Sequence, residues 1–383
     1  MTDTLSLWSL HLPTRVVFGV DALFRLPEMA IGQRLLLITT PGFVKRGVAD
    51  KVKEIMAARI IHVHDDIQPN PDLDHLDRCG KTLKPLGIDG IIALGGGSVM
   101  DSAKALAMLL GGDPALTLDA NLRGSMAAPE RALPIIAVPT TAGTGSEVTP
   151  FATIWDHAAA QKYSILGPHL RPQIALLDPK LTLGLPTEVT VSTALDAISQ
   201  AFESYWGRAS NAVTEAWAGH AFRLGLESLP QIVANPDSLV DRGQMMAASL
   251  LAGMAISHTR TAIAHSISYP ITARFGLPHG FACSFTLPAI LEFNAEQFPN
   301  RATALAHVVG EPDVTALVDR LLTLFKTVDL SSWMAAYVPT IDQLKPFIPE
   351  MITPGRADNN MRAVSFDDIE TLLERSKALV DLY

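Results

Sequence analysis

Four polar residues in the C-terminal half of the sequence have side-chain types that bind divalent metal ions. Asp196 and Gln200 lie four positions apart in a helical pattern, so both side chains point to one face of the helix. His265 and His279 follow in apolar surroundings. A carboxylate, an amide oxygen and two imidazoles can bind one cation and leave a position open for a substrate oxygen. Because spacing does not establish that the four converge, hydrogen-bonded core or helix-end residues are the alternative interpretation.

Two loops rich in glycine and hydroxyl residues lie in the N-terminal half. Residues 95–98 read Gly-Gly-Gly-Ser between a predicted strand and a predicted helix, where backbone N–H groups and the helix N-terminus favour a pyrophosphate. Residues 138–147 place Thr140, Thr141 and Thr144 after the next strand, where open α/β sheets bind ligands. The alternatives are a tight turn that needs positive φ and an ordinary Ser/Thr-rich loop. Two such loops at neighbouring strand ends favour a dinucleotide site.

The order of predicted strands and helices indicates the fold class. Apolar strands alternate with helices in the first half, which predicts a parallel sheet covered on both faces. We expect strands at 15–18, 34–39, 60–64, 90–94 and 134–138, and helices at 48–57, 72–86 and 99–110. In the second half we expect amphipathic helices at 191–206, 212–229, 241–258 and 365–382. The predicted domains are therefore an α/β, doubly wound dinucleotide-binding domain at 1–182 and an all-helical metal and substrate domain at 183–383.

Composition excludes several classes of protein. The 383 residues are 48% hydrophobic and 18% charged, which is typical of a globular chain. The formal charge of −9 disfavours nucleic acid as a partner, so small molecules are expected. Two distant cysteines, Cys79 and Cys283, exclude a disulfide framework and a Cys-rich zinc module and suit a reducing cytoplasm. We see no secretion signal, and the longest apolar run, residues 245–257, is too short to cross a membrane.

These segments together resemble the iron-containing, or group III, alcohol dehydrogenase family. The motifs that carry the resemblance span nearly the whole chain: FG at 18–19, QPNP at 68–71, GGGS at 95–98, PTTAGTGSE at 139–147, DPKLT at 178–182 and PHG at 278–280. The resemblance implies a Rossmann-like N-terminal domain and an all-helical C-terminal domain. It also implies NAD or NADP and a divalent metal, Fe²⁺ or Zn²⁺, as cofactors, and a homodimer or higher homo-oligomer.

The resemblance further implies roles for individual residues. The positions that match the family's dinucleotide contacts are Asn70, Gly95, Gly96, Gly97, Ser98, Asp101, Thr140, Thr141, Thr144 and Lys162. The positions that match its metal ligands are Asp196, Gln200, His265 and His279. Histidine is usual at the second of these, and an amide oxygen is a weaker and harder ligand than imidazole, so Gln200 implies lower affinity or a different metal. Tyr269 stands where many members have another histidine.

The residue after the second predicted strand bears on cofactor choice. Members that prefer NAD often have an acid there, which binds the ribose 2′-hydroxyl, whereas this chain has Thr40. Because threonine does not repel a 2′-phosphate as a carboxylate would, we expect NADP to be permitted. Lys45 or Arg46 could hold that phosphate, and both are equally well explained as surface charges.

The segments around the two histidines resemble a branch associated with phosphonate metabolism, whose members reduce phosphonoacetaldehyde. These segments are residues 265–270 and 278–288. A dianionic substrate would be bound by arginines or backbone donors near the metal, and His258, Arg260 and Arg274 flank the ligand segment. Surface or helix-capping roles are the alternative for each.

The expected reaction is reversible hydride transfer between NAD(P)H and a short-chain aldehyde, which gives a primary alcohol. The metal would polarise the carbonyl and the dinucleotide would supply the hydride. Besides the ligand His265, the expected catalytic residues are Tyr269 and His258, either of which could return a proton to the alkoxide, as could a metal-linked water. The alternatives are a metal-independent enzyme like maleylacetate reductase, a lyase like dehydroquinate synthase, and a nucleotide-binding protein without catalysis.

Overall fold

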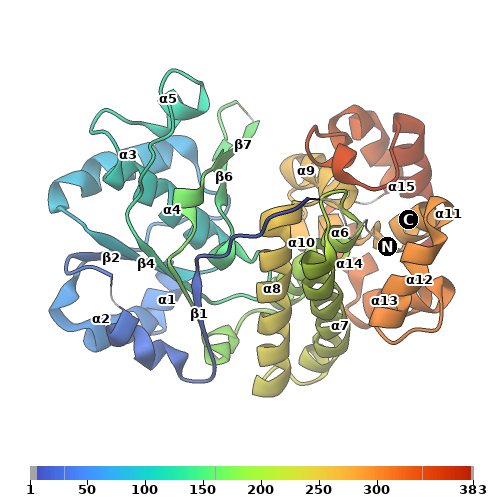
Figure 1. Ribbon diagram of the computed structural model, residues 1–383, viewed down its shortest axis with the longest axis horizontal. Coiled ribbons are helices and arrows are strands. Elements are labelled where there is room, and N and C mark those ends of the chain that lie inside the picture. Colours follow the sequence, from blue (N-terminus) through green and yellow to red (C-terminus); the bar gives the residue numbers. More distant parts are fainter. Residues whose placement is uncertain (1–6, 30, 160, 339, 381–383) are drawn as a thin grey trace. The chain divides into compact units, whose positions relative to one another are not determined.

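The computed structural model of the chain describes residues 7–29, 31–159, 161–338 and 340–380. It divides into two compact units, shown in Figure 1. The sheet unit consists of His11–Thr141 and Ser146–Thr182, drawn in blue and green. The helical unit consists, among the described residues, of 7–10, Ala142–Gly145, 183–338 and 340–380.

The sheet unit is built on a six-stranded, wholly parallel sheet. Its strands are β1 (Arg15–Phe18), β2 (Leu35–Ile38), β3 (Ile60–His64), β4 (Gly90–Gly95), β5 (Ile135–Pro139) and β8 (Ile174–Leu177). They lie in the order β1-β8-β5-β4-β2-β3. The predicted parallel sheet is confirmed, and each of the five predicted strands agrees with an observed one to within one residue at either end.

Two hydrophobic cores cover the two faces of this sheet. Leu36 and Ile38 of β2 belong to one core, whereas Leu35 and Leu37 belong to the other, because successive side chains of a strand point to opposite faces. Burial on both faces explains why the strands are apolar throughout. The α-helices of this unit are α1 (Pro41–Lys45), α2 (Val48–Met56), α3 (Leu73–Leu83), α4 (Gly97–Gly111) and α5 (Leu118–Leu122). Its 3-10 helices are η1 (Ala22–Met29) and the shorter η2 (Ala57–Arg59), η3 (Lys84–Leu86), η4 (Ser146–Val148), η5 (Pro168–Leu170) and η6 (Pro179–Thr182). The doubly wound arrangement is confirmed.

Sequence patterns did not predict three strands. A two-stranded antiparallel sheet is formed by β6 (Phe151–Asp156) and β7 (Gln161–Leu166), outside the main sheet. β7 is mostly polar and half-exposed, so it carries no apolar signal. β8 is only four residues long, and it pairs with both β1 and β5.

The helical unit contains ten α-helices among its described residues. They are α6 (Thr187–Trp206), α7 (Ala212–Ala234), α8 (Leu239–Thr259), α9 (Ile263–Phe275), α10 (His279–Ser284), α11 (Leu287–Gln297), α12 (Pro299–Val308), α13 (Val314–Thr327), α14 (Leu330–Tyr337) and α15 (Phe366–Val380). Two 3-10 helices, η7 (Ile341–Met351) and η8 (Ala357–Asn359), lie between α14 and α15. The long helices α7 and α8 run side by side, and α6 packs against both (Figure 1).

The predicted helices of this unit are confirmed, and most extend beyond the predicted ends. The last one begins as expected, because Ser365 N donates to Asp368 Oδ2 at 2.8 Å and Asp368 N donates to Ser365 Oγ at 3.2 Å. Its predicted end at Leu382 lies outside the described residues. Among the helices that are described, none is both long and apolar enough to span a membrane.

Candidate metal centre and cofactor loops

Four potential metal-binding side chains of the helical unit converge in the structure. Donor atoms of Asp196, His265, His279 and Cys283 all lie within 4.8 Å of one another. His265 Nε2 lies 3.3 Å from Asp196 Oδ1, and the two imidazole rings are 5.2 Å apart at 72°. The structure thus brings together three of the residues that the sequence nominated as ligands. Cys283, one helical turn after His279, was not nominated.

Three helices position this cluster. Asp196 lies in the middle of α6, His265 near the start of α9, and His279 at the first position of α10. The close approach of α10 to α6 requires Gly280, because a Cβ at that position would overlap with the carbonyl oxygen of Ser192. The glycine after His279 therefore allows this imidazole to reach the carboxylate on α6.

The side-chain amide of Gln200 is only partly satisfied by hydrogen bonds from the described residues. Its Nε2 donates a hydrogen bond to Asp196 Oδ1 at 3.1 Å, as expected for residues four apart on one helix. Its Oε1 is buried and accepts no hydrogen bond from any described residue. An unsatisfied buried acceptor costs about 1–3 kcal/mol. A 180° rotation of the amide would exchange its N and O and turn Oε1 toward Asp196, so Gln200 could then serve as a neutral oxygen ligand and the donor set fits a divalent metal ion.

Glu203 supports His265 from the side opposite Asp196. His265 Nδ1 donates to Glu203 Oε2 at 2.6 Å, and the backbone N–H groups of Ala264 and His265 donate to Glu203 Oε1. Holding Nδ1 as the donor leaves Nε2 turned toward Asp196, an arrangement that orients and strengthens an imidazole ligand. Glu203 stands seven residues after Asp196, on the same face of α6, and its spacing from Asp196 is the only sequence signal that could have indicated its role.

The charges around the cluster favour a cation. Burial lowers the pKa of His265, but the neighbouring carboxylates of Glu203 and Asp196 outweigh burial and raise it to about 10. Burial also opposes ionisation of Asp196, yet the hydrogen bond from His265 and the nearby imidazoles hold its pKa below the ordinary value. Burial raises the pKa of the Cys283 thiol well above its usual range. Positive charge is therefore stabilised between the carboxylates, which suits a metal ion.

Tyr269 and His258, the two expected proton donors, occupy different environments. The ring of Tyr269 stacks on His279 with centroids 6.3 Å apart and an angle of 15°. His258 lies in the last turn of α8, where its Nδ1 is 2.9 Å from Ser257 Oγ and 3.0 Å from the carbonyl oxygen of Met254. Tyr269 therefore adjoins the metal cluster directly.

The two arginines expected near the substrate also differ. Arg274 donates two hydrogen bonds to the exposed carboxylate of Glu350, at 3.2 and 2.5 Å. Arg260 is exposed at the C-terminal end of α8 and has a φ of 62°. The guanidinium of Arg274 is thus held in a surface ion pair, whereas that of Arg260 forms none with the residues that the structure describes.

The glycine loop of the sheet unit joins β4 to α4, as the sequence indicated. Gly95 ends β4, Gly96 precedes α4, and Gly97 and Ser98 form its first turn. A Cβ at Gly95 would overlap with Val99, so the turn requires glycine there. The neighbouring loop after β5 begins beside it, since Thr140 N donates to the carbonyl oxygen of Gly95 at 3.0 Å.

The two threonines that follow in this loop belong to different units. Thr141 lies next to Gly96 in the sheet unit. Thr144 lies in the segment Ala142–Gly145 of the helical unit. Thr40 follows β2 and precedes the first turn of α1, without a side-chain capping bond.

Asp101 and Lys104 of α4 form a buried polar network. Asp101 accepts hydrogen bonds from Ser146 Oγ at 2.8 Å and from the backbone of Thr153 at 2.9 Å. Lys104 Nζ donates to Ser146 Oγ, Thr149 Oγ1 and the carbonyl oxygen of Phe151, and burial lowers its pKa to about 8. The network ties α4 to β6 and to the segment before it.

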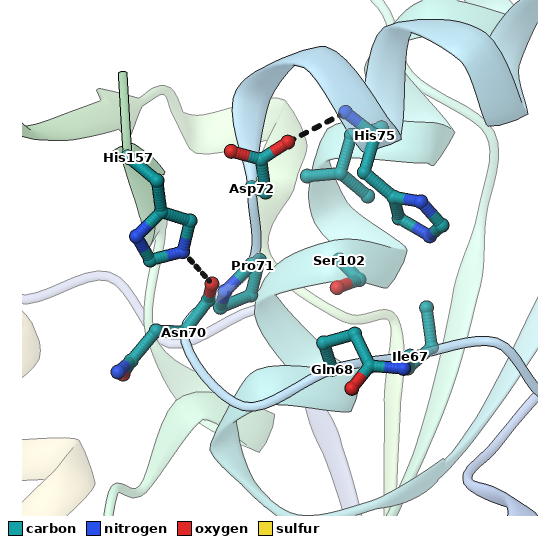
Figure 2. Close-up of a pocket in the computed structure, with 9 residues that line it drawn as sticks. Ile67, Gln68, Asn70, Pro71, Asp72, His75, Ser102 and His157 are labelled. Carbon is teal, nitrogen blue, oxygen red and sulfur yellow. Dashed lines mark hydrogen bonds between the residues drawn. The ribbon is translucent and has the colours of Figure 1, made fainter. Parts of the chain in front are cut away.

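Asn70 lines a cavity of about 310 Å³ in the sheet unit, shown in Figure 2. It has a φ of 57°, and its carbonyl oxygen is 3.3 Å from His157 Nε2. Gln68, His75 and Ser102 line the same cavity.

Lys162, another position matched to the family's dinucleotide contacts, lies on β7. Its Nζ is 5.8 Å from the centre of the Trp155 ring.

Comparison with known proteins agrees with this architecture. The model of the family "Iron-containing alcohol dehydrogenase" matches residues 13–179, and that of "Fe-containing alcohol dehydrogenase family, C-terminal" matches residues 190–377. A sulfoacetaldehyde reductase of Bilophila wadsworthia is 31% identical over 356 residues, which cover 90% of this chain and 91% of the relative. A phosphonoacetaldehyde reductase of Streptomyces viridochromogenes is 36% identical over 268 residues, 68% of this chain and 67% of the relative.

Solved structures extend the comparison to three dimensions. The sulfoacetaldehyde reductase of Bifidobacterium kashiwanohense, in complex with NAD⁺, superposes with a TM-score of 0.90 at 30% identity, covering 98% of this chain and 99% of that one. Fold and site thus define an oxidoreductase of the alcohol dehydrogenase class. The chain belongs to the iron-containing alcohol dehydrogenase family.

Proposed function

We propose that this protein reduces a short-chain aldehyde to a primary alcohol with NADH or NADPH, in a reaction that needs a divalent metal ion. The single observation that carries the proposal is the convergence of the buried Asp196 and His265 with the half-buried His279. The NAD⁺ complex of the Bifidobacterium reductase supports the choice of a nicotinamide cofactor.

The residues of the helical unit have distinct roles in this proposal. Asp196, His265 and His279 bind the metal, which is Fe²⁺ or Zn²⁺, and Gln200 adds its amide oxygen. Glu203 fixes the tautomer and orientation of His265 through the 2.6 Å hydrogen bond. When bound, the metal supplies Lewis-acid chemistry to the aldehyde carbonyl, and the nicotinamide supplies the hydride. Tyr269, stacked on His279, holds a proton at Oη for the product alkoxide.

The loops of the sheet unit hold the dinucleotide in this proposal. Gly95, Gly96, Gly97 and Ser98 offer backbone N–H groups at the start of α4 to the pyrophosphate, helped by the partial positive charge of the helix N-terminus. The remaining proposed contacts in this unit are Thr40, Asn70, Asp101, Thr140, Thr141 and Lys162, and Thr144 is the proposed contact from the helical unit. Because Thr40 carries no charge, both NAD and NADP are accommodated. Two free, buried cysteines support a reducing cytoplasm as the location.

Two relatives with chemically similar substrates support a proposal for the substrate class. The Bilophila and Streptomyces relatives are reductases of sulfoacetaldehyde and phosphonoacetaldehyde, which are both two-carbon aldehydes with a strongly acidic head group. We therefore include phosphonoacetaldehyde and sulfoacetaldehyde among the aldehydes that this enzyme reduces.

A metal-independent reduction, as in maleylacetate reductases, is the second candidate. Gln200 is the observation that favours it, because an amide oxygen binds metals less strongly than the imidazole usual in the family. Retention of full activity after chelation would support this candidate.

The test is a reduction assay with the purified full-length protein. Phosphonoacetaldehyde, sulfoacetaldehyde, acetaldehyde and propionaldehyde are each supplied with NADH or NADPH, after chelation and after addition of Fe²⁺ or Zn²⁺. We expect metal-dependent oxidation of NAD(P)H with formation of an equal amount of alcohol. Absence of turnover across the whole panel, despite tight binding of the dinucleotide, would overturn the proposal in favour of a non-catalytic nucleotide-binding protein.

A further inference from the structure

Arg356 contacts Tyr269, the tyrosine whose ring stacks on the proposed metal ligand His279. Arg356 Nε donates a hydrogen bond to Tyr269 Oη at 3.2 Å, and the ring of Tyr269 stacks on His279. The other contact of the guanidinium is to the carbonyl oxygen of Gly355 at 3.0 Å. Arg356 is half-buried and forms no ion pair with a carboxylate in the described part of the chain. Its positive charge is therefore uncompensated close to the proposed reaction centre.

A second arginine approaches the same loop. A Cβ at Gly355, which has a φ of 75°, would lie 3.7 Å from Nη1 of Arg260. Arg260 likewise forms no ion pair with any described acidic residue. Its backbone has φ 62° and ψ 177°, a conformation that costs about 1–3 kcal/mol in a residue other than glycine. Such strain is found mainly at binding and catalytic sites, where the surrounding structure maintains it.

Hydrogen bonds fix both arginines relative to the metal cluster. Ser266, the residue after His265, donates from Oγ to the carbonyl oxygen of Met351 at 2.6 Å and accepts from Thr353 N at 2.8 Å. Asn359 Nδ2 donates to the carbonyl oxygens of Thr259 and Thr261, on either side of Arg260, at 2.8 and 3.0 Å. The loop 351–359 and the end of α8 are thus held to α9, which carries His265 and Tyr269.

We infer that Arg356, assisted by Arg260, binds the anionic head group of the aldehyde substrate. The inference rests on the proposed function and specifies its substrate class: a short aldehyde with a phosphonate or sulfonate group. A guanidinium can donate two parallel N–H hydrogen bonds to the oxygens of a phosphonate or sulfonate. Because Arg356 is not paired with a described carboxylate, its guanidinium is available to bind these oxygens. Arg274, by contrast, is already paired with Glu350.

The test compares an anionic aldehyde with a neutral one in the same metal-loaded enzyme. The value of kcat/KM is measured for phosphonoacetaldehyde and for propionaldehyde in the wild type, R356A, R356K and R260A. Loss of a hydrogen bond between charged groups reduces binding by about 10- to 100-fold, so the selectivity for the anionic aldehyde falls by that factor in R356A. R356K keeps the charge without the planar pair of donors and loses less, and R260A shows a smaller loss in the same direction.

Three controls separate head-group binding from a structural role. R375A removes an exposed arginine that is paired with Glu292 on another helix and leaves the selectivity ratio unchanged. Y269F removes the hydroxyl that contacts Arg356 but keeps the guanidinium; turnover of both aldehydes falls, because Tyr269 Oη is the proposed proton donor, and their selectivity ratio stays closer to the wild-type value than in R356A. With propionaldehyde as substrate, competitive inhibition by methylphosphonate becomes at least about tenfold weaker in R356A.

The possible outcomes distinguish this inference from the proposed function. Equal losses for both aldehydes in R356A, or an unchanged selectivity ratio and unchanged methylphosphonate inhibition, would overturn the role of Arg356. Metal-dependent turnover of neutral aldehydes would still support the reductase in that case. If the wild type turns over neither class of aldehyde, the proposed function itself fails.

Discussion

Two groups of histidine and cysteine side chains in this molecule have similar compositions but different surroundings. One is the cluster of Asp196, His265, His279 and Cys283 in the helical unit. The other, in the sheet unit, consists of His64 at the end of β3 with His75 and Cys79 of α3, whose donor atoms also lie within 4.8 Å of one another. If the distance between potential ligand atoms were the only criterion, both groups would be candidate metal sites.

The electrostatic environments separate the two groups. In the helical unit, carboxylates on both sides of His265 raise its pKa to about 10. In the sheet unit, burial and the neighbouring His75 lower the pKa of His64 below its ordinary value. His75 Nε2 is bonded to the carbonyl oxygen of Asp66 at 2.8 Å, and the Asp66 carboxylate is largely exposed to solvent. The cluster of the helical unit thus has two buried acids, Asp196 and Glu203, against His265, whereas the acid beside the other cluster, Asp66, is largely exposed.

The largest effect is expected from removing the buried carboxylate ligand. Asp196→Asn keeps the shape of the side chain and removes its charge, so we expect loss of the bound metal and a decrease in kcat/KM of about 10³-fold or more. Metal analysis of the purified variant and the aldehyde assay measure the two effects. Unchanged thermal unfolding would show that the fold persists, whereas wild-type metal content would contradict the assignment.

The supporting acid provides a second way to test the comparison. Glu203→Gln leaves His265 without its charged partner, so metal affinity should fall about 10- to 100-fold. Asp66→Asn, next to the other cluster, is the matched control and should leave metal affinity unchanged. Competition with a chromophoric chelator measures both. Equal affinities in the wild type and Glu203→Gln would mean that Glu203 contributes only to packing.

Replacing the proposed amide ligand should increase the metal affinity of the helical-unit cluster further above that of the sheet-unit cluster. Gln200→His supplies an imidazole at the position where the family usually has one, so we expect about tenfold tighter binding of Zn²⁺ or Fe²⁺. The rate at which metal is lost to excess chelator reports the change. A faster loss than in the wild type would indicate that Gln200 Oε1 does not face the metal.

The smallest effect is expected at the sheet-unit cluster. Cys79→Ser and His75→Gln should leave the metal content of the protein and its aldehyde reductase activity unchanged, because these residues lie outside the proposed centre. Inductively coupled plasma mass spectrometry of the dialysed variants provides the measurement. A second bound ion in the wild type that disappears in Cys79→Ser would show that this cluster binds metal after all.

Sequence patterns predicted the parts of the fold and site whose signals are local. The apolar strands of the parallel sheet and the i, i+4 pair Asp196 and Gln200 could be read from neighbouring residues. Arg356 could not, since its contact with Tyr269 spans 87 positions. Glu203 resembled any polar residue of a helix, because its role depends on a histidine 62 positions away. The β6–β7 pair was missed because β7 is polar and half-exposed.

The most direct test of the account is to add metal back to the chelated wild-type enzyme while measuring bound metal and aldehyde reduction together. We expect NAD(P)H-linked activity to be absent after chelation and to increase in proportion to metal occupancy, reaching its maximum at about one ion per chain. Full activity of the metal-free enzyme, or activity unrelated to occupancy, would contradict the claim that Asp196, His265 and His279 form the catalytic metal centre.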